Sequence, residues 1–212
     1  MKQAWLQPLP LIAILRGVHP EEVVAVGTAL LEAGFHALEV PLNSPRPFAS
    51  IECLARAFGD HCTVGAGTVL TTMDVERVAD AGGRLIVMPH TDPAVIAAAK
   101  QKCLYCTPGT TTPSEAFAAL RAGADAIKVF PAEQITPKVL RAWRAVLPLD
   151  IDVLPVGGIA ASSMAEYVKA GANGFGIGSA LYKPGRSITD IAAAARTFAA
   201  AWKIIAAEGP QQ

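Results

Sequence analysis

The segment Ala126-Ile127-Lys128-Val129-Phe130-Pro131 is an apolar, strand-like run with one lysine in its middle. Because side chains alternate along a strand, Lys128 lies on the face opposite to Ile127 and Val129. Lysine is rarely fully buried unless it is paired. If its face lines a dry pocket, desolvation lowers the pKa of the amine and leaves it nucleophilic enough to form a Schiff base with a ketone. The alternative is a surface lysine with a packed stem and a solvated head.

Similar extended runs recur along the whole chain and alternate with helix-like segments of three-to-four-residue apolar spacing. The runs span residues 11–16, 37–42, 63–69, 85–89, 104–108, 126–131, 152–157 and 174–178. Pro20-Glu21-Glu22 favours a helix N-terminus, and Ala-Gly pairs such as Ala33-Gly34 favour helix ends. Eight strands alternating with eight helices predict a single (β/α)8 TIM barrel. A doubly wound open sheet is the alternative, but no Gly-x-Gly-x-x-Gly follows the first run.

Composition favours one well-cored domain spanning residues 1–212, with residues 209–212 as a loose tail. The 18 basic residues balance the 18 acidic residues, and no basic stripe is present, so we expect no nucleic-acid partner. Prolines and Arg16 interrupt the apolar N-terminal segment, which argues against a signal peptide. Four charged residues interrupt the alanine-rich C-terminal stretch, which argues against a membrane span. We therefore expect a soluble cytoplasmic protein with no membrane partner.

Four of the runs carry a polar residue at or near the end where a barrel gathers its active site. Arg16 ends the first run, Glu39 lies late in the second, Thr68 is near the end of the third, and Lys128 lies late in the sixth. Each has a structural alternative: Arg16 could pair with a surface carboxylate, Glu39 could only neutralise Lys128, and Thr68 could be a strand former. Because all four would converge at one end of the barrel, an active site is the favoured interpretation.

Two glycine-containing segments follow the last two runs and have the character of a phosphate site. Gly157-Gly158 follows the seventh run, and Gly178-Ser179 follows the eighth. Glycines let backbone N–H groups approach an anion, a following helix N-terminus favours negative charge, and barrels often bind phosphate at these two loops. Tight turns are the structural alternative. No histidine or cysteine spacing completes a metal site, so we expect neither a metal nor another cofactor.

Several segments together identify a family resemblance. They are residues 11–17, 39–45, 65–69, 128–131, 157–158 and 178–179. In order and register, from about residue 9 to 182, they resemble the 2-keto-3-deoxy-6-phosphosugar-acid aldolases. The phosphogluconate branch of that family usually has Thr-Leu-Arg after the Glu-Val pair and Thr before the paired glycines. Here Pro41-Leu42-Asn43 and Val156 occupy those places, which is typical of the galactonate branch.

The resemblance implies a homotrimeric, metal-independent class I aldolase of galactonate catabolism. Such an enzyme cleaves a phosphorylated sugar acid to pyruvate and D-glyceraldehyde 3-phosphate. The resemblance makes Lys128 the Schiff-base lysine and Glu39 the general acid/base, and it places Arg16 at the substrate carboxylate. The other implied substrate-binding residues are Thr68, Pro89, Phe130, Gly157, Gly158, Gly178 and Ser179.

Three alternative functions stay open on the sequence. Within the same chemistry, the substrate could be the phosphogluconate epimer or 4-hydroxy-2-oxoglutarate. A phosphosugar isomerase or epimerase on the same barrel would share the glycine loops and use Glu39 as a base without an imine. A non-catalytic sugar-phosphate binder is disfavoured, because it has no need of an amine at Lys128.

Overall fold

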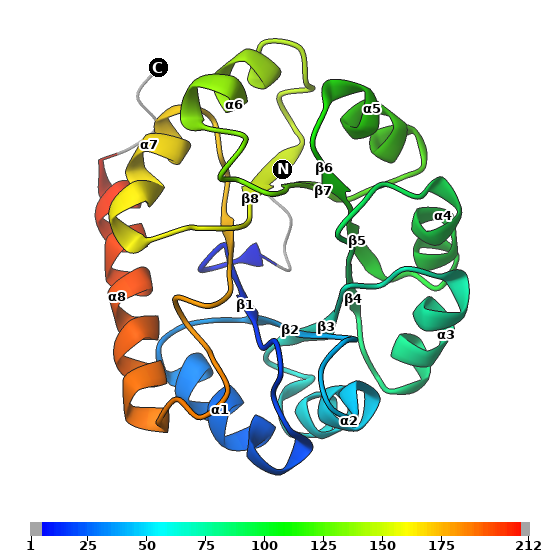
Figure 1. Ribbon diagram of the computed structural model, residues 1–212, viewed down its shortest axis with the longest axis vertical. Coiled ribbons are helices and arrows are strands. Elements are labelled where there is room, and N and C mark those ends of the chain that lie inside the picture. The colour runs from blue at the N-terminus through cyan, green and yellow to red at the C-terminus, as the bar shows by residue number, and fades with distance from the viewer. Residues whose placement is uncertain (1–5, 209–212) are drawn as a thin grey trace.

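The computed structural model describes residues 6–208 and has an α/β fold in which a parallel sheet curls and helices cover its outer face (Figure 1). The strands are β1 (Leu11–Ile14), β2 (Ala37–Pro41), β3 (Thr63–Gly67), β4 (Leu85–Val87), β5 (Tyr105–Thr107), β6 (Gly109–Thr110), β7 (Ala126–Val129), β8 (Asp152–Pro155) and β9 (Phe175–Ile177). Every extended run expected from the sequence contains a strand. The two-residue strand β6 was not expected.

The helices lie between the strands in chain order. They are α1 (Pro20–Glu32), α2 (Pro47–Phe58), α3 (Thr72–Asp80), α4 (Pro93–Gln101), α5 (Pro113–Arg121), α6 (Pro137–Arg144), the 3-10 helix η2 (Ala161–Ser163), α7 (Met164–Lys169) and α8 (Ile188–Ala207). Five of them begin with proline, which lacks the N–H that a first helical residue leaves unpaired. Side chains also cap helices: at α5 the Thr112 oxygen accepts from the Glu115 N–H, and at α8 the Ser187 oxygen accepts from the Asp190 N–H.

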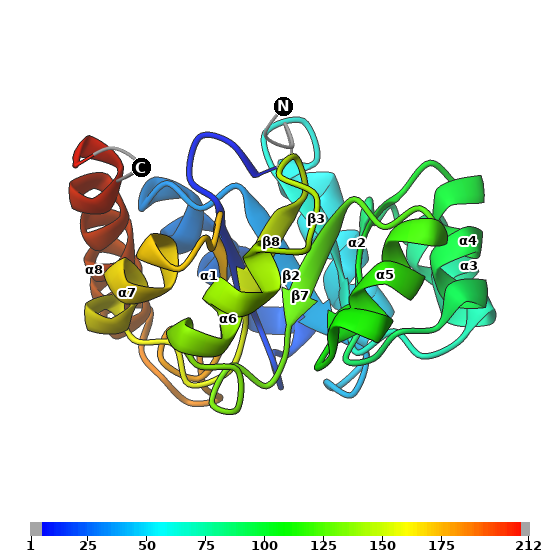
Figure 2. The ribbon, with the colours of Figure 1, turned by 90° about the horizontal axis from the view of Figure 1, so that it is seen from above.

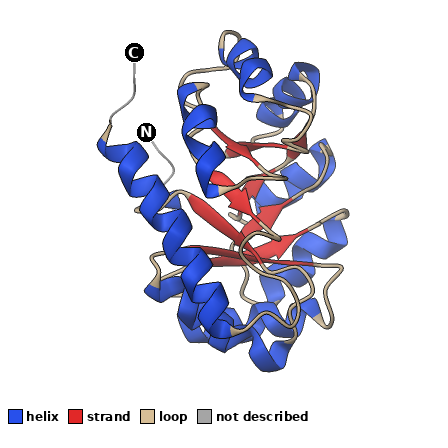
Figure 3. Ribbon diagram, turned by 60° about the vertical axis from the view of Figure 1, so that its left-hand side comes forward, coloured by secondary structure: helices blue, strands red, loops and turns tan. Residues whose placement is uncertain are grey.

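The strands form a six-stranded sheet in the order β5-β4-β3-β2-β1-β9 and a three-stranded sheet in the order β6-β7-β8, and all pairs are parallel. Backbone contacts also join the two sheets. The Asp125 N–H donates to the Cys106 carbonyl at 2.9 Å on one side, and a parallel bridge links Val156 to Gly176 on the other. Figure 2, a view from above, and Figure 3, a view turned to one side, show helices flanking the strands.

The two faces of the curled sheet belong to different apolar clusters. The larger cluster lies between the sheet and the helices. The smaller cluster lies on the inner face and consists of Leu6, Ile12, Ala37, Leu85, Val87, Ala126 and Leu154. Ala37 and Ala126 stand two residues before Glu39 and Lys128, so each pair shares the inner face of its strand. The inner cluster therefore forms an apolar floor, and the two charged residues lie above it.

No helix within residues 6–208 combines the length and the apolar character that crossing a membrane would require. The expected loose tail, residues 209–212, lies outside the described residues.

Asp125 fastens the junction between β5 and β7. Its Oδ2 atom accepts hydrogen bonds from Lys100 Nζ at 2.6 Å and from the Cys106 N–H at 2.8 Å. Lys100 Nζ also donates to the Leu104 carbonyl at 3.1 Å. One carboxylate thus ties α4, β5 and the start of β7 together.

We expect Asp125→Ala to lower the free energy of unfolding by about 1–3 kcal/mol, because a part-buried N–H and an ammonium lose their acceptor. Asp125→Asn keeps an acceptor oxygen and is expected to lose less. Urea unfolding followed by circular dichroism measures both variants. An alanine variant as stable as the wild type would show that this junction does not depend on the carboxylate.

Candidate active site

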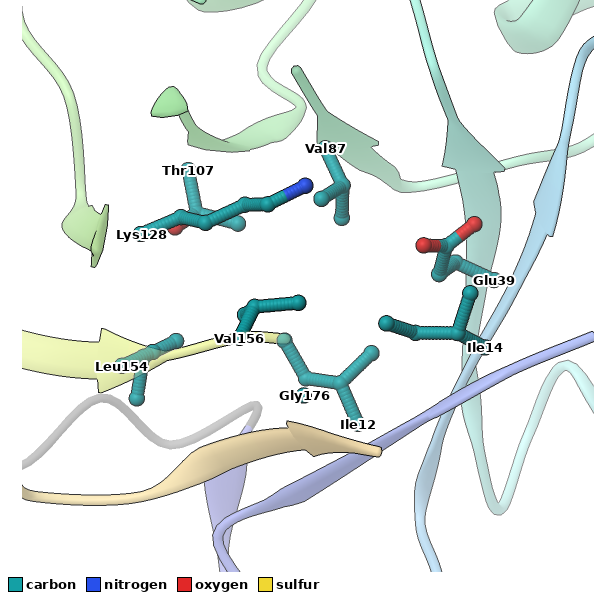
Figure 4. A pocket seen from close by; sticks show the side chains of 9 residues that line it. All are labelled: Ile12, Ile14, Glu39, Val87, Thr107, Lys128, Leu154, Val156 and Gly176. Atoms are coloured by element: carbon teal, nitrogen blue, oxygen red, sulfur yellow. The ribbon is translucent and has the colours of Figure 1, made fainter. Parts of the chain in front are cut away.

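Lys128 and Glu39 extend from opposite sides into one pocket that strands of both sheets line (Figure 4). Lys128 comes from β7 and is 6% exposed, and Glu39 comes from β2 and is 2% exposed. The other lining residues are Ile12, Ile14, Val87, Thr107, Leu154, Val156 and Gly176. A pocket walled mostly by apolar groups gives little solvation to either charge, so burial shifts both groups toward their neutral forms.

Burial raises the pKa of Glu39 to about 7, and the positive charges of Lys128 and Arg16 oppose this rise. Its Oε2 atom is buried and has no hydrogen-bond partner among the described residues. A carboxyl group with a pKa near neutrality is suited to take up and return a proton at the pH of a cell.

Burial lowers the pKa of Lys128 to about 8, while the negative charge of Glu39 raises it and Arg16 lowers it further. The Nζ atom lies 4.5 Å from the centre of the Phe130 ring, within the range of a cation–π contact. An ordinary lysine is almost wholly protonated at neutral pH, whereas a pKa near 8 leaves a useful share of free amine. That share is the nucleophile required for an imine.

Gly67 of β3 makes room for Glu39. Glu39 stands beside Gly65 in the β2–β3 register, and Pro41 stands beside Gly67. A Cβ atom on Gly67 would overlap the Glu39 carboxylate, and one on Gly65 would overlap the Leu85 carbonyl. Glycine inside a strand often marks such a close approach. The absence of a side chain at Gly67 is therefore the local condition for a buried carboxylate at Glu39.

Three more residues expected at the site follow the ends of strands in the six-stranded sheet. Arg16 follows β1 and is exposed, and its Nη1 atom donates to Asn43 Oδ1 at 2.7 Å. Thr68 follows β3 with a φ of 57°, a left-handed conformation that is strained for a β-branched residue. Pro89 follows β4 and is half-buried. Because Arg16 acts on the pKa of both Glu39 and Lys128, it belongs to the same electrostatic site.

The two glycine loops lie next to each other, because the Val156–Gly176 bridge joins the strand segments that precede them. Gly157 and Gly158 have positive φ values of 109° and 61°, which explains the glycines. A helix follows the first loop closely, because the 3-10 helix η2 begins at Ala161 and α7 continues from Met164. For the second loop the expected helix N-terminus was wrong, since α8 begins only at Ile188.

Sequence reasoning missed three residues at the site. Thr107 is fully buried and lines the pocket, Asn43 holds Arg16, and the Glu133 side chain lies against Gly157 and Gly158. Strand alternation within residues 104–108 was the available signal for Thr107. Within residues 6–208, no group of three or more histidine, cysteine, aspartate or glutamate side chains could hold a metal ion.

Known proteins resemble this chain over most of its length. A probable 2-dehydro-3-deoxy-6-phosphogalactonate aldolase of Rhizobium meliloti (strain 1021) is 52% identical over 182 residues, which is 86% of each chain. The 2-dehydro-3-deoxy-6-phosphogalactonate aldolase of Escherichia coli (strain K12) is 44% identical over 199 residues, covering 94% of this chain and 97% of that protein.

The same relation holds in three dimensions. A solved structure described as native KDPGal superposes with a TM-score of 0.95 at 42% identity, covering 97% of this chain and all of the other. The family model for KDPG and KHG aldolases matches residues 3–194. The chain therefore belongs to the KDPG and KHG aldolase family.

Proposed function

We propose that this protein cleaves 2-dehydro-3-deoxy-6-phospho-D-galactonate to pyruvate and D-glyceraldehyde 3-phosphate through an imine on Lys128. One observation carries the chemistry: a buried amine of lowered pKa faces a buried carboxyl of raised pKa across a pocket that opens among the strand ends. The substrate is proposed from the two relatives above, whose names specify the galactonate compound.

The reaction begins when neutral Lys128 attacks the C2 ketone. Loss of water gives a cationic iminium, which serves as the electron sink for breaking the C3–C4 bond. Glu39 removes the C4 hydroxyl proton as that bond breaks, and glyceraldehyde 3-phosphate leaves. The remaining enamine takes a proton at C3, and hydrolysis of the iminium releases pyruvate and restores the amine.

The surrounding residues bind and orient the substrate. The planar guanidinium of Arg16 suits the C1 carboxylate, since a bidentate fork fits a carboxylate better than an ammonium does. Thr68 and Pro89 lie beside the reacting carbons, and Phe130 shields the amine from water. Gly157, Gly158, Gly178 and Ser179 take the phosphate at the far end. Binding there contributes to orienting the cleaved bond.

The wider architecture extends the same proposal. We infer that residues 1–212 form one domain whose sheet closes as a (β/α)8 barrel, with β5 and β6 as two parts of one barrel strand. The hydrogen bonds from the Asp125 and Lys128 N–H groups to the Cys106 and Pro108 carbonyls support this, as does the Val156–Gly176 bridge. A homotrimer stays a prediction from the resemblance, and a cytoplasmic location stays a prediction from the sequence.

Borohydride reduction in the presence of pyruvate tests the imine. We expect a stable adduct that maps to Lys128 by mass spectrometry, and we expect Lys128→Ala to abolish both the adduct and cleavage. Lys138→Ala removes an exposed lysine on α6 and is the matched control, expected to behave as the wild type. A Lys128→Ala enzyme with near-normal turnover would refute the mechanism, and an isomerase or epimerase would give no adduct.

The two C4 epimers of the substrate test specificity. We expect kcat/KM for the galactonate epimer to exceed that for the gluconate epimer by about tenfold or more, the scale on which a few pocket contacts discriminate. Coupled lactate dehydrogenase detection of pyruvate measures both on one enzyme sample. Equal kcat/KM values, or a higher value for the gluconate epimer, would refute galactonate specificity and favour the phosphogluconate alternative.

Gly67→Ala tests the room made for Glu39. The added methyl group displaces the carboxylate, so we expect kcat to fall by roughly a hundredfold, as expected for Glu39→Gln, while borohydride trapping of pyruvate persists. The double variant Gly67→Ala/Glu39→Gln is the control, and its loss should not exceed that of either single variant. Additive losses would mean that Gly67 acts on something other than Glu39.

A further inference from the structure

The segment between β9 and α8 begins with a tight turn that carries Gly178 and Ser179. The Leu181 and Tyr182 N–H groups both donate to the Gly178 carbonyl, at 2.8 and 3.0 Å. A Cβ atom added to Gly178 would meet no heavy atom beyond its chain neighbours within 4 Å. The turn is thus hydrogen-bonded internally and leaves open space beside the glycine.

The Tyr182 side chain joins this turn to α1, 160 residues earlier in the chain. Tyr182 is 3% exposed, and its hydroxyl donates to Glu22 Oε1 at 2.9 Å. The same oxygen accepts from the His19 N–H at 3.2 Å, so the acceptor is itself fixed at the start of α1. Burial, and after it the bond to Glu22, raises the pKa of Tyr182, which keeps the hydroxyl a donor at neutral pH. In Figure 1 the orange segment that precedes α8 runs beside α1.

A second contact brings the same segment against the loop that carries Arg16. A Cβ atom added to Gly17 would lie 2.8 Å from Pro184 Cγ, so the Pro184 ring packs directly on the Gly17 backbone. Gly17 has a φ of 84°, a conformation that favours glycine. The loop after β1 and the turn after β9 are therefore neighbours that touch.

The other side-chain hydrogen bonds of residues 178–186 stay within that segment. Arg186 Nη1 donates to the Ala180 and Leu181 carbonyls at 2.8 and 3.0 Å. These bonds preserve the shape of the turn, but they do not fix its place relative to α1. Within residues 6–208, the bond from Tyr182 to Glu22 is the side-chain hydrogen bond that ties residues 178–186 to another part of the chain.

We propose that Tyr182 is a positioning residue that fixes the distance between the two sites for the charged ends of the substrate. This inference rests on the proposed function, which assigns the substrate carboxylate to Arg16 and the phosphate to the loops that include Gly178 and Ser179. A phosphorylated sugar acid must reach both sites at once. A turn held at the correct distance then aligns the C3–C4 bond with the amine and the carboxyl of the pocket. An acid without phosphate uses only the carboxylate site and gains nothing from this alignment.

The test compares the phosphorylated sugar acid with the same acid lacking its phosphate. Tyr182→Phe keeps the buried ring and removes the hydroxyl. We expect kcat/KM for the phosphorylated acid to fall by about tenfold, the scale of one hydrogen bond to a charged group, while kcat/KM for the unphosphorylated acid stays unchanged. Coupled lactate dehydrogenase detection of pyruvate measures both. If the unphosphorylated acid is cleaved too slowly to follow, borohydride trapping of pyruvate, which also lacks phosphate, provides the comparison.

Glu22 supplies the matched variants. Glu22→Gln keeps an acceptor oxygen and should retain most of the preference for the phosphorylated acid, whereas Glu22→Ala should lose it to the same extent as Tyr182→Phe. The double variant Tyr182→Phe/Glu22→Ala should lose no more than either single variant, because both remove the same bond. Melting temperatures measured alongside record the stability cost, which lowers neither rate selectively.

Three results would overturn the inference while leaving the aldolase proposal intact. One is a Tyr182→Phe enzyme with the wild-type preference for the phosphorylated acid. Another is an equal loss for both acids, which would indicate a general structural role. The third is additive losses in the double variant. A wild-type enzyme that neither cleaves the sugar acid nor traps pyruvate would instead refute the proposed function.

Discussion

The removal of one amine and one carboxyl from water is the constraint on which the rest of this structure depends. Burial is the largest cause of both shifts, raising the pKa of Glu39 to about 7 and lowering that of Lys128 to about 8. Keeping either group charged in the pocket costs desolvation free energy, which the attraction between the two charges offsets in part. The apolar clusters on both faces of the sheet must outweigh this cost.

The fold meets this constraint through the alternation of its strands. On β2 and β7, an alanine of the inner cluster precedes each charged residue by two positions, so the apolar floor and the reactive groups belong to the same strand faces. Gly67 of β3 then leaves the space that the Glu39 carboxylate fills. Arg16 supplies a third charge from the exposed rim, where it can meet a substrate without being buried itself.

Local periodicity predicted the strands and helices well, because each run had its own apolar face and its own proline or glycine boundaries. It could not predict β6, where Pro108 interrupts the segment and the chain changes neighbour from β4 to β7. Lys128 and Glu39 were predictable as unusual charges within apolar runs. The site positions of Thr107, Asn43 and Glu133 were not predictable from the sequence. A threonine in a strand and polar residues in loops are common, and only the tertiary contacts show that these three lie at the site.

The loops after β1 and β2 are tied to each other before any ligand arrives. Arg16 Nη1 donates to Asn43 Oδ1 at 2.7 Å, and the Gly17 N–H donates to Ser44 Oγ at 2.9 Å. Ordering of this side of the entrance is thus completed during folding, and association with a carboxylate need not supply that entropy again. Substitutions that change which sugar acid binds are consequently easier to accommodate on the opposite side of the entrance. There, new side chains would not have to break the hydrogen bonds that join these two loops.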